Sequence, residues 1–217
     1  YGVVSREAVA AENLPGGFGP LYRLFKQMEE TGRVRRGHFV EGLSGAQFAL
    51  PGAVERLRAA RIDEEPIEGF DEDQLRILSA VDPANPYGAL LSWPPTTMQA
   101  GPETGNKQAS KQAPKRIAGA WLLLIAGRPI IYVGAGGRQI QTFSRGDEAA
   151  IGALSLACQA LHRLPSGGRR RLLVQQIDGA PALESPLREV LLGAGFECDY
   201  DALRPSSVAG RDPNAIA

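Results

Sequence analysis

The sequence predicts an α+β fold in two parts: a winged helix-turn-helix, followed by an antiparallel, barrel-like β-sheet domain that carries two helices. Within residues 1–61, helical spacing of apolar residues gives way to strand alternation, which is the order of a winged helix. Residues 74–217 contain several short apolar strands and two apolar helical stretches. Residues 62–73 are acidic and contain proline and glycine, so we expect a linker there.

Two helices are expected at the start of the chain. Ser5 precedes the stretch "REAVAAEN" and is a typical N-cap residue. Residues 15–17, Pro-Gly-Gly, interrupt the helix, and Gly32 is expected to end a second one. Between these breaks, four apolar residues recur at three- and four-residue spacing and predict a helix buried on one side: Leu21, Leu24, Phe25 and Met28.

A basic β-hairpin and a third helix are expected next. Residues 34–40 alternate as a strand, "EGLSG" is a turn, and "AQFAL" returns as the partner strand. Pro51 then begins the helix "PGAVERLRAAR". This is the order of a winged helix whose first helix would precede Tyr1. Because the chain also lacks a starting methionine, we expect it to be a piece of a longer protein.

Residues 74–217 are expected to form strands and helices around a loop. The stretches "LRILSAVD" and "YGALLSW" are predicted strands, and the polar, basic residues 94–116 are predicted to be a mobile loop. The next apolar run indicates three strands with turns at 127–129 and 134–137. A helix "DEAAIGALSLACQALHRL", a strand "RRRLLVQQIDG" and a helix capped by Ser185 follow, and the C-terminal end is expected to be irregular.

The charges are unevenly distributed although they sum to zero. Residues 1–61 carry nine basic and six acidic residues. Residues 62–93 carry one basic and eight acidic residues, and residues 94–116 carry four basic and one acidic. A neutral chain does not by itself indicate nucleic-acid binding, but the locally basic first block keeps that class of function open.

Cysteine usage and hydropathy indicate the compartment. Cys158 and Cys198 are too few for a disulfide framework or a metal site, and we expect both to be small buried hydrophobic residues in a reducing compartment. No apolar run is long enough to span a bilayer, and no signal-peptide pattern is present. These features favour a cytoplasmic protein.

Several kinds of catalytic chemistry are disfavoured by the residues present. The Gly-rich stretch 134–137 lacks the GK[ST] and the helix of a phosphate-binding loop, so a hairpin turn is the better interpretation. Ser44 lacks the GxSxG context of a nucleophilic serine. Neither His38 nor His162 has a Cys or His at ligand spacing, so metal chemistry is not expected. Asp178-Gly179 is a turn signal.

The basic hairpin is the strongest candidate for a binding function. Because side chains alternate along a strand, Arg33 and Arg35 are expected on one face and Arg36 and His38 on the other. Contacts to phosphates need only two or three cations and read no sequence. The alternative, which the residues leave equally open, is pairing on a solvated surface with nearby glutamates: Glu29, Glu30 and Glu41.

The order and spacing of several short strings resemble the C-terminal region of large helicase-related (Lhr) proteins. The strings are "YGVVSREAV", "PGGF", "GRVRRGHFVEG", "AQFALPGAVERLR", "DPANPYG", "SWP", "IDG" and "GAGF", and they extend over nearly the whole chain. The family consists of bacterial superfamily 2 DNA helicases. Their C-terminal extension contains winged-helix modules and a β-barrel similar to AlkZ-type DNA glycosylases. The resemblance implies DNA repair as the setting. It places ATP, Mg and the ATPase motifs in N-terminal domains of the parent chain, so no cofactor is expected here.

The same resemblance raises a glycosylase alternative. AlkZ-type enzymes use a Gln–apolar–Gln motif, and Gln139-Ile140-Gln141 has these letters on a predicted strand. Two glutamines on one side of a strand are more often exposed hairpin residues. Uracil removal is associated with this region of the family, and three acids are equally weak candidates for its catalytic group: Asp178, Asp199 and Asp201.

The sequence therefore favours a nucleic-acid-binding and scaffolding segment of an ATP-dependent Lhr-type DNA helicase, not catalytic by itself. The residues expected to contact phosphates are Arg23, Lys26, Arg33, Arg35, Arg36 and His38. The expected partners are DNA, single-stranded or in a hybrid with RNA, and other domains of the same chain, in the bacterial cytoplasm near the nucleoid and without a membrane. The alternatives are a DNA glycosylase module for uracil or alkylated bases, and a platform for protein interaction or self-association.

Overall fold

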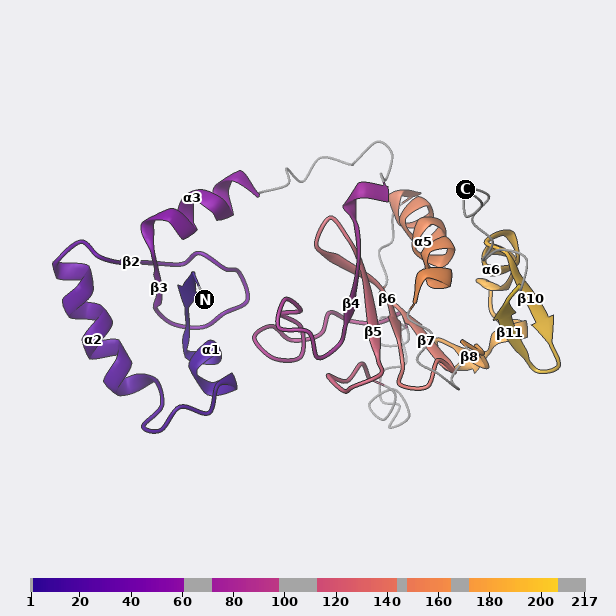
Figure 1. The fold of residues 1–217 in the computed structure, drawn as a ribbon, viewed down its shortest axis with the longest axis horizontal. Helices are drawn as coiled ribbons and strands as arrows, with labels where there is room; N and C mark the ends of the chain where they lie inside the picture. The colour runs from indigo at the N-terminus through magenta and orange to yellow at the C-terminus, as the bar shows by residue number, and fades with distance from the viewer. Residues whose placement is uncertain (1, 61–71, 98–112, 144–147, 165–171, 207–217) are drawn as a thin grey trace, which may run out of the picture. The chain divides into compact units, whose positions relative to one another are not determined.

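The computed structural model describes residues 2–60, 72–97, 113–143, 148–164 and 172–206 (Figure 1). The chain divides into two compact units. The first comprises Tyr1–Glu65 and Pro86–Trp93, and the second Pro66–Asn85 and Pro94–Ala217. Most of the predicted linker 62–73 and of the predicted loop 94–116 lies outside the described residues. None of the described helices is long and apolar enough to cross a membrane.

The first unit has the predicted order of helices and hairpin. In chain order its elements are β1 (Val3–Val4), α1 (Arg6–Ala11), α2 (Phe18–Glu30), β2 (Arg35–Gly37), β3 (Gln47–Ala49) and α3 (Pro51–Ala59). The three short strands form one antiparallel sheet in the order β1-β3-β2, with the helices around it (Figure 1). The winged-helix prediction is confirmed. Strand β1, which no pattern in the sequence predicts, pairs with β3 through Val3 and Val4.

Local capping signals place the ends of these helices as predicted. The Ser5 hydroxyl accepts a hydrogen bond from the Ala8 amide at 3.2 Å and begins α1. Gly32 follows α2 with a φ of 72°, a left-handed conformation that glycine adopts without steric cost. Pro51 occupies the first turn of α3, where its missing amide proton leaves no helical hydrogen bond unmade.

The inner face of α2 packs against Phe48 of the central strand β3. The Phe25 ring stacks on Phe48 at 5.2 Å, and the Tyr22 ring meets it edge-on at 5.6 Å. Phe48 itself is 1% exposed. The prediction that Leu24 belongs to this buried face is wrong, because Leu24 is 50% exposed. Its helix neighbours Tyr22 and Phe25 turn toward Phe48 instead, and this rotates Leu24 outward.

The described residues of the second unit form a six-stranded sheet, three 3-10 helices, two α-helices and a separate hairpin. The sheet strands are β4 (Leu75–Ser79), β5 (Trp121–Ile125), β6 (Arg128–Val133), β7 (Gln139–Thr142), β8 (Gln176–Ile177) and β9 (Ala180–Pro181). The remaining elements are η1 (Glu72–Gln74), α5 (Glu148–Ala160), η2 (Leu161–Arg163), η3 (Ala182–Glu184), α6 (Arg188–Gly193), β10 (Phe196–Asp199) and β11 (Ala202–Pro205). This confirms the α+β class.

The sheet runs in sequence order from β4 to β9, and these two strands are its edges in the described part of the chain, so the sheet is open. All neighbouring pairs are antiparallel except β7 and β8, which are parallel. A parallel pair needs a crossover connection, and here that connection includes α5. Helix α5 packs against β5 and β6 (Figure 1), and buried Leu123, Ile131, Ala157 and Leu161 form part of the shared core.

Two predicted strand or coil assignments are corrected. Residues 87–93 do not form a strand. The Pro86 carbonyl accepts hydrogen bonds from Leu90 and Leu91, so the chain turns back, and the Tyr87 and Trp93 rings stack 6.1 Å apart. The C-terminal end is not irregular either, because β10 and β11 form a two-stranded hairpin.

Smaller corrections concern a cap and a cysteine. Helix α6 begins after Leu187 rather than after Ser185, although the Ser185 hydroxyl does accept from the Leu187 amide at 3.3 Å. Cys198 is exposed, contrary to expectation, because it lies in the C-terminal hairpin. Cys158 is buried in α5 as expected, and burial raises the pKa of its thiol to about 12.

Candidate nucleic-acid interface and an amide-lined pocket

The long helix of the first unit presents two exposed cations on one face. Arg23 and Lys26 lie three residues apart in α2, so their side chains share one side of the helix. Arg33 follows the helix end and His38 follows β2, and both are exposed. Within the described ranges, Arg23, Lys26 and Arg33 have no ion-pair partner, which leaves their charges open to an anionic ligand.

The two central wing arginines, predicted on opposite faces of the strand, pair with carboxylates of different helices. Nη1 of Arg35 lies 3.5 Å from Oε1 of Glu55 in α3. Nε of Arg36 lies 3.3 Å from Oε1 of Glu29 in α2, and its Nη1 donates to the Tyr22 hydroxyl at 3.4 Å. Such half-exposed pairs are worth about 0–1 kcal/mol each. A phosphate that approached Arg35 or Arg36 would nevertheless have to displace a carboxylate.

A buried glutamine fixes the backbone of the wing loop, a role that the sequence did not reveal. Gln47 is fully buried, and its Oε1 accepts from the amides of Phe39 and Val40, both at 2.9 Å. Its Nε2 donates to the Val40 carbonyl at 2.9 Å and to the Leu43 carbonyl at 3.4 Å. One side chain therefore satisfies backbone groups that a tight loop would otherwise leave unpaired.

A second contact ties the tip of the wing to helix α1. Oε1 of Glu7 accepts from the Ser44 hydroxyl at 2.6 Å and from the Ser44 amide at 3.0 Å. Burial raises the pKa of Glu7, but hydrogen bonds from Ser44, from the Glu7 amide and from Ser5 outweigh it and lower the pKa to about 2. Ser44 is thus a structural residue, in agreement with its lack of a nucleophile motif.

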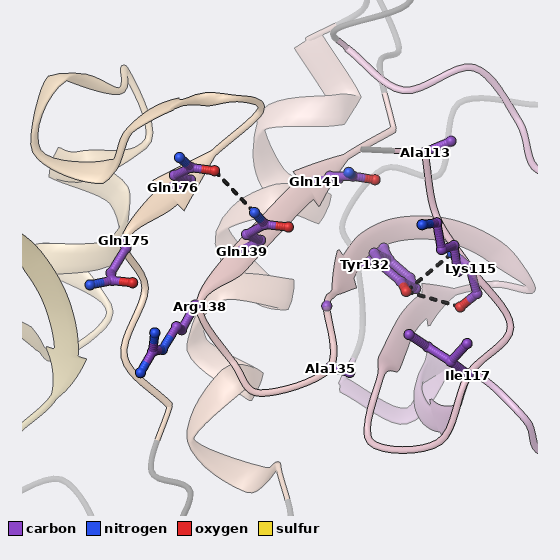
Figure 2. A pocket seen from close by; sticks show the side chains of 11 residues that line it. Ala113, Lys115, Ile117, Tyr132, Ala135, Arg138, Gln139, Gln141, Gln175 and Gln176 are labelled. Atoms are coloured by element: carbon purple, nitrogen blue, oxygen red, sulfur yellow. Dashed lines mark hydrogen bonds between the residues drawn. The ribbon is translucent and has the colours of Figure 1, made fainter. Parts of the chain in front are cut away.

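The second unit contains a pocket of about 460 Å³ beside strands β6, β7 and β8 (Figure 2). The loop 134–137 borders it and is a hairpin turn, as predicted, because the Gly137 amide donates to the Gly134 carbonyl at 3.0 Å. The polar side chains of the lining are four amides, two cations and a phenol: Gln139, Gln141, Gln175, Gln176, Arg138, Lys115 and Tyr132.

Strand register explains why the glutamines gather. Gln139 and Gln141 lie two residues apart in β7 and share one face of the sheet, while Ile140 between them is buried on the other. The parallel pairing of β7 with β8 places Gln176 beside Gln139, and Nε2 of Gln139 donates to Oε1 of Gln176 at 3.1 Å (Figure 2). The Arg138 carbonyl accepts from the amides of Gln175 and Gln176, which holds this segment in place.

The opposite side of the pocket is formed by the chain that enters β5 (Figure 2). The Tyr132 hydroxyl donates to the Lys115 carbonyl at 2.9 Å and accepts from the Lys115 amide at 3.1 Å. Burial raises the pKa of the Tyr132 phenol, and the hydrogen bond from Lys115 acts in the opposite direction. The Lys115 side chain is exposed and carries a positive charge at this edge.

The three acids that the sequence offered as catalytic candidates do not line the pocket. Asp178 accepts from the Thr142 amide at 2.8 Å and from its hydroxyl at 2.7 Å, in a turn where its φ is 48°. Burial raises the pKa of Asp178, while these hydrogen bonds act against it. Asp199 pairs with Arg204 at 3.4 Å, and Asp201 is exposed in the C-terminal hairpin. No acid is among the described lining residues.

The remaining candidates have structural roles. A ring nitrogen of His162 lies 2.7 Å from the Ala194 carbonyl, and its ring packs on Phe196. Arg116, at the end of the predicted basic loop, donates to four backbone carbonyls, including those of Ala80 and Asn85, and so clamps the turn after β4. In the described part of the chain, no group of His, Cys, Asp and Glu side chains has the arrangement of a metal site.

Comparison with known proteins finds one family model and two relatives that all carry the name of the large helicase-related proteins. Residues 1–68 match the family model described as the large helicase-related protein winged-helix domain. The chain is 38% identical over 212 residues to a Mycolicibacterium smegmatis protein named "Lhr helicase/ probable uracil glycosylase", a match that covers 94% of this chain. The chain is related to the large helicase-related (Lhr) family. An Escherichia coli Lhr protein, named "Lhr helicase/uracil glycosylase", is 36% identical over 94% of the chain.

The match extends beyond the winged helix into the second unit, since it covers 94% of the chain in both Lhr proteins. The chain itself spans only 13% and 12% of the length of these two relatives. It therefore aligns with one segment of each of these two proteins.

Proposed function

We propose that this segment binds nucleic acid through the first unit and serves as a binding and scaffolding part of a longer Lhr-type helicase. The observation that carries the proposal is the set of exposed cations with no ion-pair partner among the described residues, on a winged-helix frame: Arg23, Lys26 and Arg33. His38 follows β2 and is also exposed. Arg35 and Arg36 contribute once a phosphate replaces their carboxylate partners.

The arrangement suits contact with a phosphate backbone rather than with base edges. Arg23 and Lys26 project from a helix whose other side is held by the aromatic contacts to Phe48. The wing beside them has a loop fixed by Gln47 and Glu7, so little conformational entropy is lost when a strand binds. Cations on a rigid surface neutralise phosphates and fix the orientation of the strand without reading its sequence.

The test compares two charge-matched triple variants for binding a fluorescent single-stranded DNA near 0.1 M salt. We expect Arg23→Gln with Lys26→Gln and Arg33→Gln to weaken binding about ten- to hundred-fold, because each cation releases counterions from the strand. The control combines Arg163→Gln, Arg188→Gln and Arg204→Gln, three ion-paired residues of the second unit. Equal weakening of DNA binding in both variants would show that the effect comes from net charge. It would contradict the proposal that these three residues form the interface.

The names of the two relatives also mention uracil glycosylase, and the longer protein that contains this segment is proposed to couple ATP hydrolysis to DNA unwinding and repair. For this segment alone we do not favour base excision, because the amide-lined pocket has no carboxylate among its described lining residues. Incubation of the chain with uracil-containing single-stranded DNA tests this directly. Abasic product in excess of a heat-denatured control would show that the segment is catalytic after all.

A further inference from the structure

The amide-lined pocket of the second unit has no part in the proposed phosphate contacts of the wing. We propose that it binds one unpaired nucleotide, whose base is held by the glutamine amides and whose phosphate lies on Arg138 or Lys115. This inference concerns a different site from the winged helix and goes beyond the proposed function. We take this nucleotide to be part of a nucleic-acid strand rather than a free nucleotide. The reason is that the exposed cations of the first unit, Arg23, Lys26 and Arg33, are proposed to bind the phosphates of the same strand.

The hydrogen-bonding capacity of the glutamines is the first reason. Each carboxamide offers one acceptor oxygen and two N–H donors. The bond between Gln139 and Gln176 uses one N–H of the former and one lone pair of the latter. The other donors and acceptors of both amides remain at the pocket wall, next to the amide of Gln141. Bases present donors and acceptors side by side on their edges, and glutamine can bond such an edge at two points.

Preorganisation is the second reason. Gln139 and Gln176 are register partners on adjacent parallel strands, and their mutual bond fixes both side chains before a ligand arrives. The backbone of Gln176 is held in turn by the Arg138 carbonyl at 3.1 Å. A ligand therefore loses less binding energy to side-chain ordering than it would on flexible surface glutamines.

Charge and size are the third reason. Arg138 and Lys115 are exposed at the pocket, and within the described residues neither has an ion-pair partner. No described lining residue is acidic, so no carboxylate of the lining repels an anion there. The volume of about 460 Å³ lies in the range of small-ligand pockets and accommodates a base with its sugar. Because Tyr132 is buried and its hydroxyl is bonded to Lys115, we assign recognition to hydrogen bonds rather than to stacking.

The first experiment asks whether binding depends on bases. Fluorescence anisotropy compares a short oligothymidine with an abasic tetrahydrofuran oligomer of the same length and charge. We expect the intact 217-residue chain to bind the base-containing oligomer at least five-fold more tightly. The variant Gln139→Ala with Gln176→Ala should lose that preference, while the control Gln159→Ala, an exposed glutamine of α5, should keep it. Equal affinity of the native chain for both oligomers would overturn the proposal.

The second experiment locates the base by NMR of the glutamine side-chain amides. Uridine and adenosine 5′-monophosphates should shift the signals of Gln139 and Gln176, and ribose 5-phosphate and inorganic phosphate should not. Equal shifts with phosphate alone would reduce the site to an anion site and overturn the proposal. If mononucleotides shift these signals but oligomer binding does not depend on bases, the pocket binds free nucleotides. That result would contradict the proposal that it binds a nucleotide within a strand. The triple variant of Arg23, Lys26 and Arg33 should weaken binding of the base-containing and the abasic oligomer to the same extent. A failure of the proposed wing interface can therefore be distinguished from a failure of the proposed pocket.

Discussion

At the scale of single residues, the polar contacts that shape the wing come from positions far apart in the sequence. The alternation of Arg35 and Arg36 was predictable because strand geometry alone dictates it. Their partners were predictable only in part. The sequence offers Glu29 as a partner but not Glu55 of α3, since that pair depends on how α3 returns across the sheet. Gln47 gave no signal at all, because a buried amide cannot be distinguished from an exposed one in the sequence.

Replacement of Gln47 by alanine should destabilise the first unit. The change leaves the half-buried amides of Phe39 and Val40 without their acceptor, so we expect a loss of about 1–3 kcal/mol in the free energy of unfolding. Urea unfolding followed by fluorescence measures this loss. The matched control is Gln27→Ala, at an exposed position of α2, which should change stability by less than about 0.5 kcal/mol. Similar losses in both variants would mean that the Gln47 contacts add nothing.

The Glu7–Ser44 contact should make the stability of the wing depend on pH in the acid range. The folded pKa of Glu7, about 2, lies below its ordinary value of 4.5, so the ionised form stabilises the fold above pH 4.5 and that contribution declines as pH falls toward 2. The difference in unfolding free energy between the native chain and Glu7→Gln should therefore shrink across this window. A difference that stays constant from pH 6 to pH 2.5 would contradict the assignment.

At the scale of elements, hydrophobic periodicity predicted most helices and strands. It failed where an apolar stretch forms a turn instead of a strand. Residues 87–93 are apolar enough to suggest a strand, but the Pro86 carbonyl and the left-handed Gly88 close a compact turn. The parallel pairing of β7 with β8 could not be predicted either, because it joins strands separated by a whole helix. Without that pairing, Gln139 and Gln176 would not have been placed together, although the Gln–apolar–Gln string did mark one half of the pocket.

Two glycine substitutions should act in opposite directions. Gly88 has a φ of +74°, and a Cβ there would lie 2.5 Å from Nε1 of Trp93, so Gly88→Ala should destabilise the first unit by about 1–3 kcal/mol. Gly52 lies in α3 with open space around it, so Gly52→Ala should stabilise by about 0.5–1 kcal/mol. Thermal unfolding of the two variants shows whether each substitution raises or lowers stability. Destabilisation by Gly52→Ala, or tolerance of Gly88→Ala, would show that the local geometry is wrongly assigned.

At the scale of the whole chain, the two units carry different kinds of binding residue. The first unit carries cations on a winged-helix frame, and the second carries an amide-lined pocket whose lining includes two cations. The charge pattern along the sequence indicated the first of these, because residues 1–61 carry nine basic and six acidic residues. It gave no indication of the second, which depends on how the strands of the second unit are ordered in its sheet.

The salt dependence of single-stranded DNA binding tests this division most directly. The logarithm of the affinity should fall linearly with the logarithm of salt concentration, with a slope of about −0.7 per phosphate contact. The variant lacking Arg23, Lys26 and Arg33 should therefore show a slope shallower by about 2, while the variant lacking the Gln139 and Gln176 amides should bind more weakly with an unchanged slope. Parallel lines for the native chain and the cation variant would contradict the central claim that the winged helix holds the phosphate backbone.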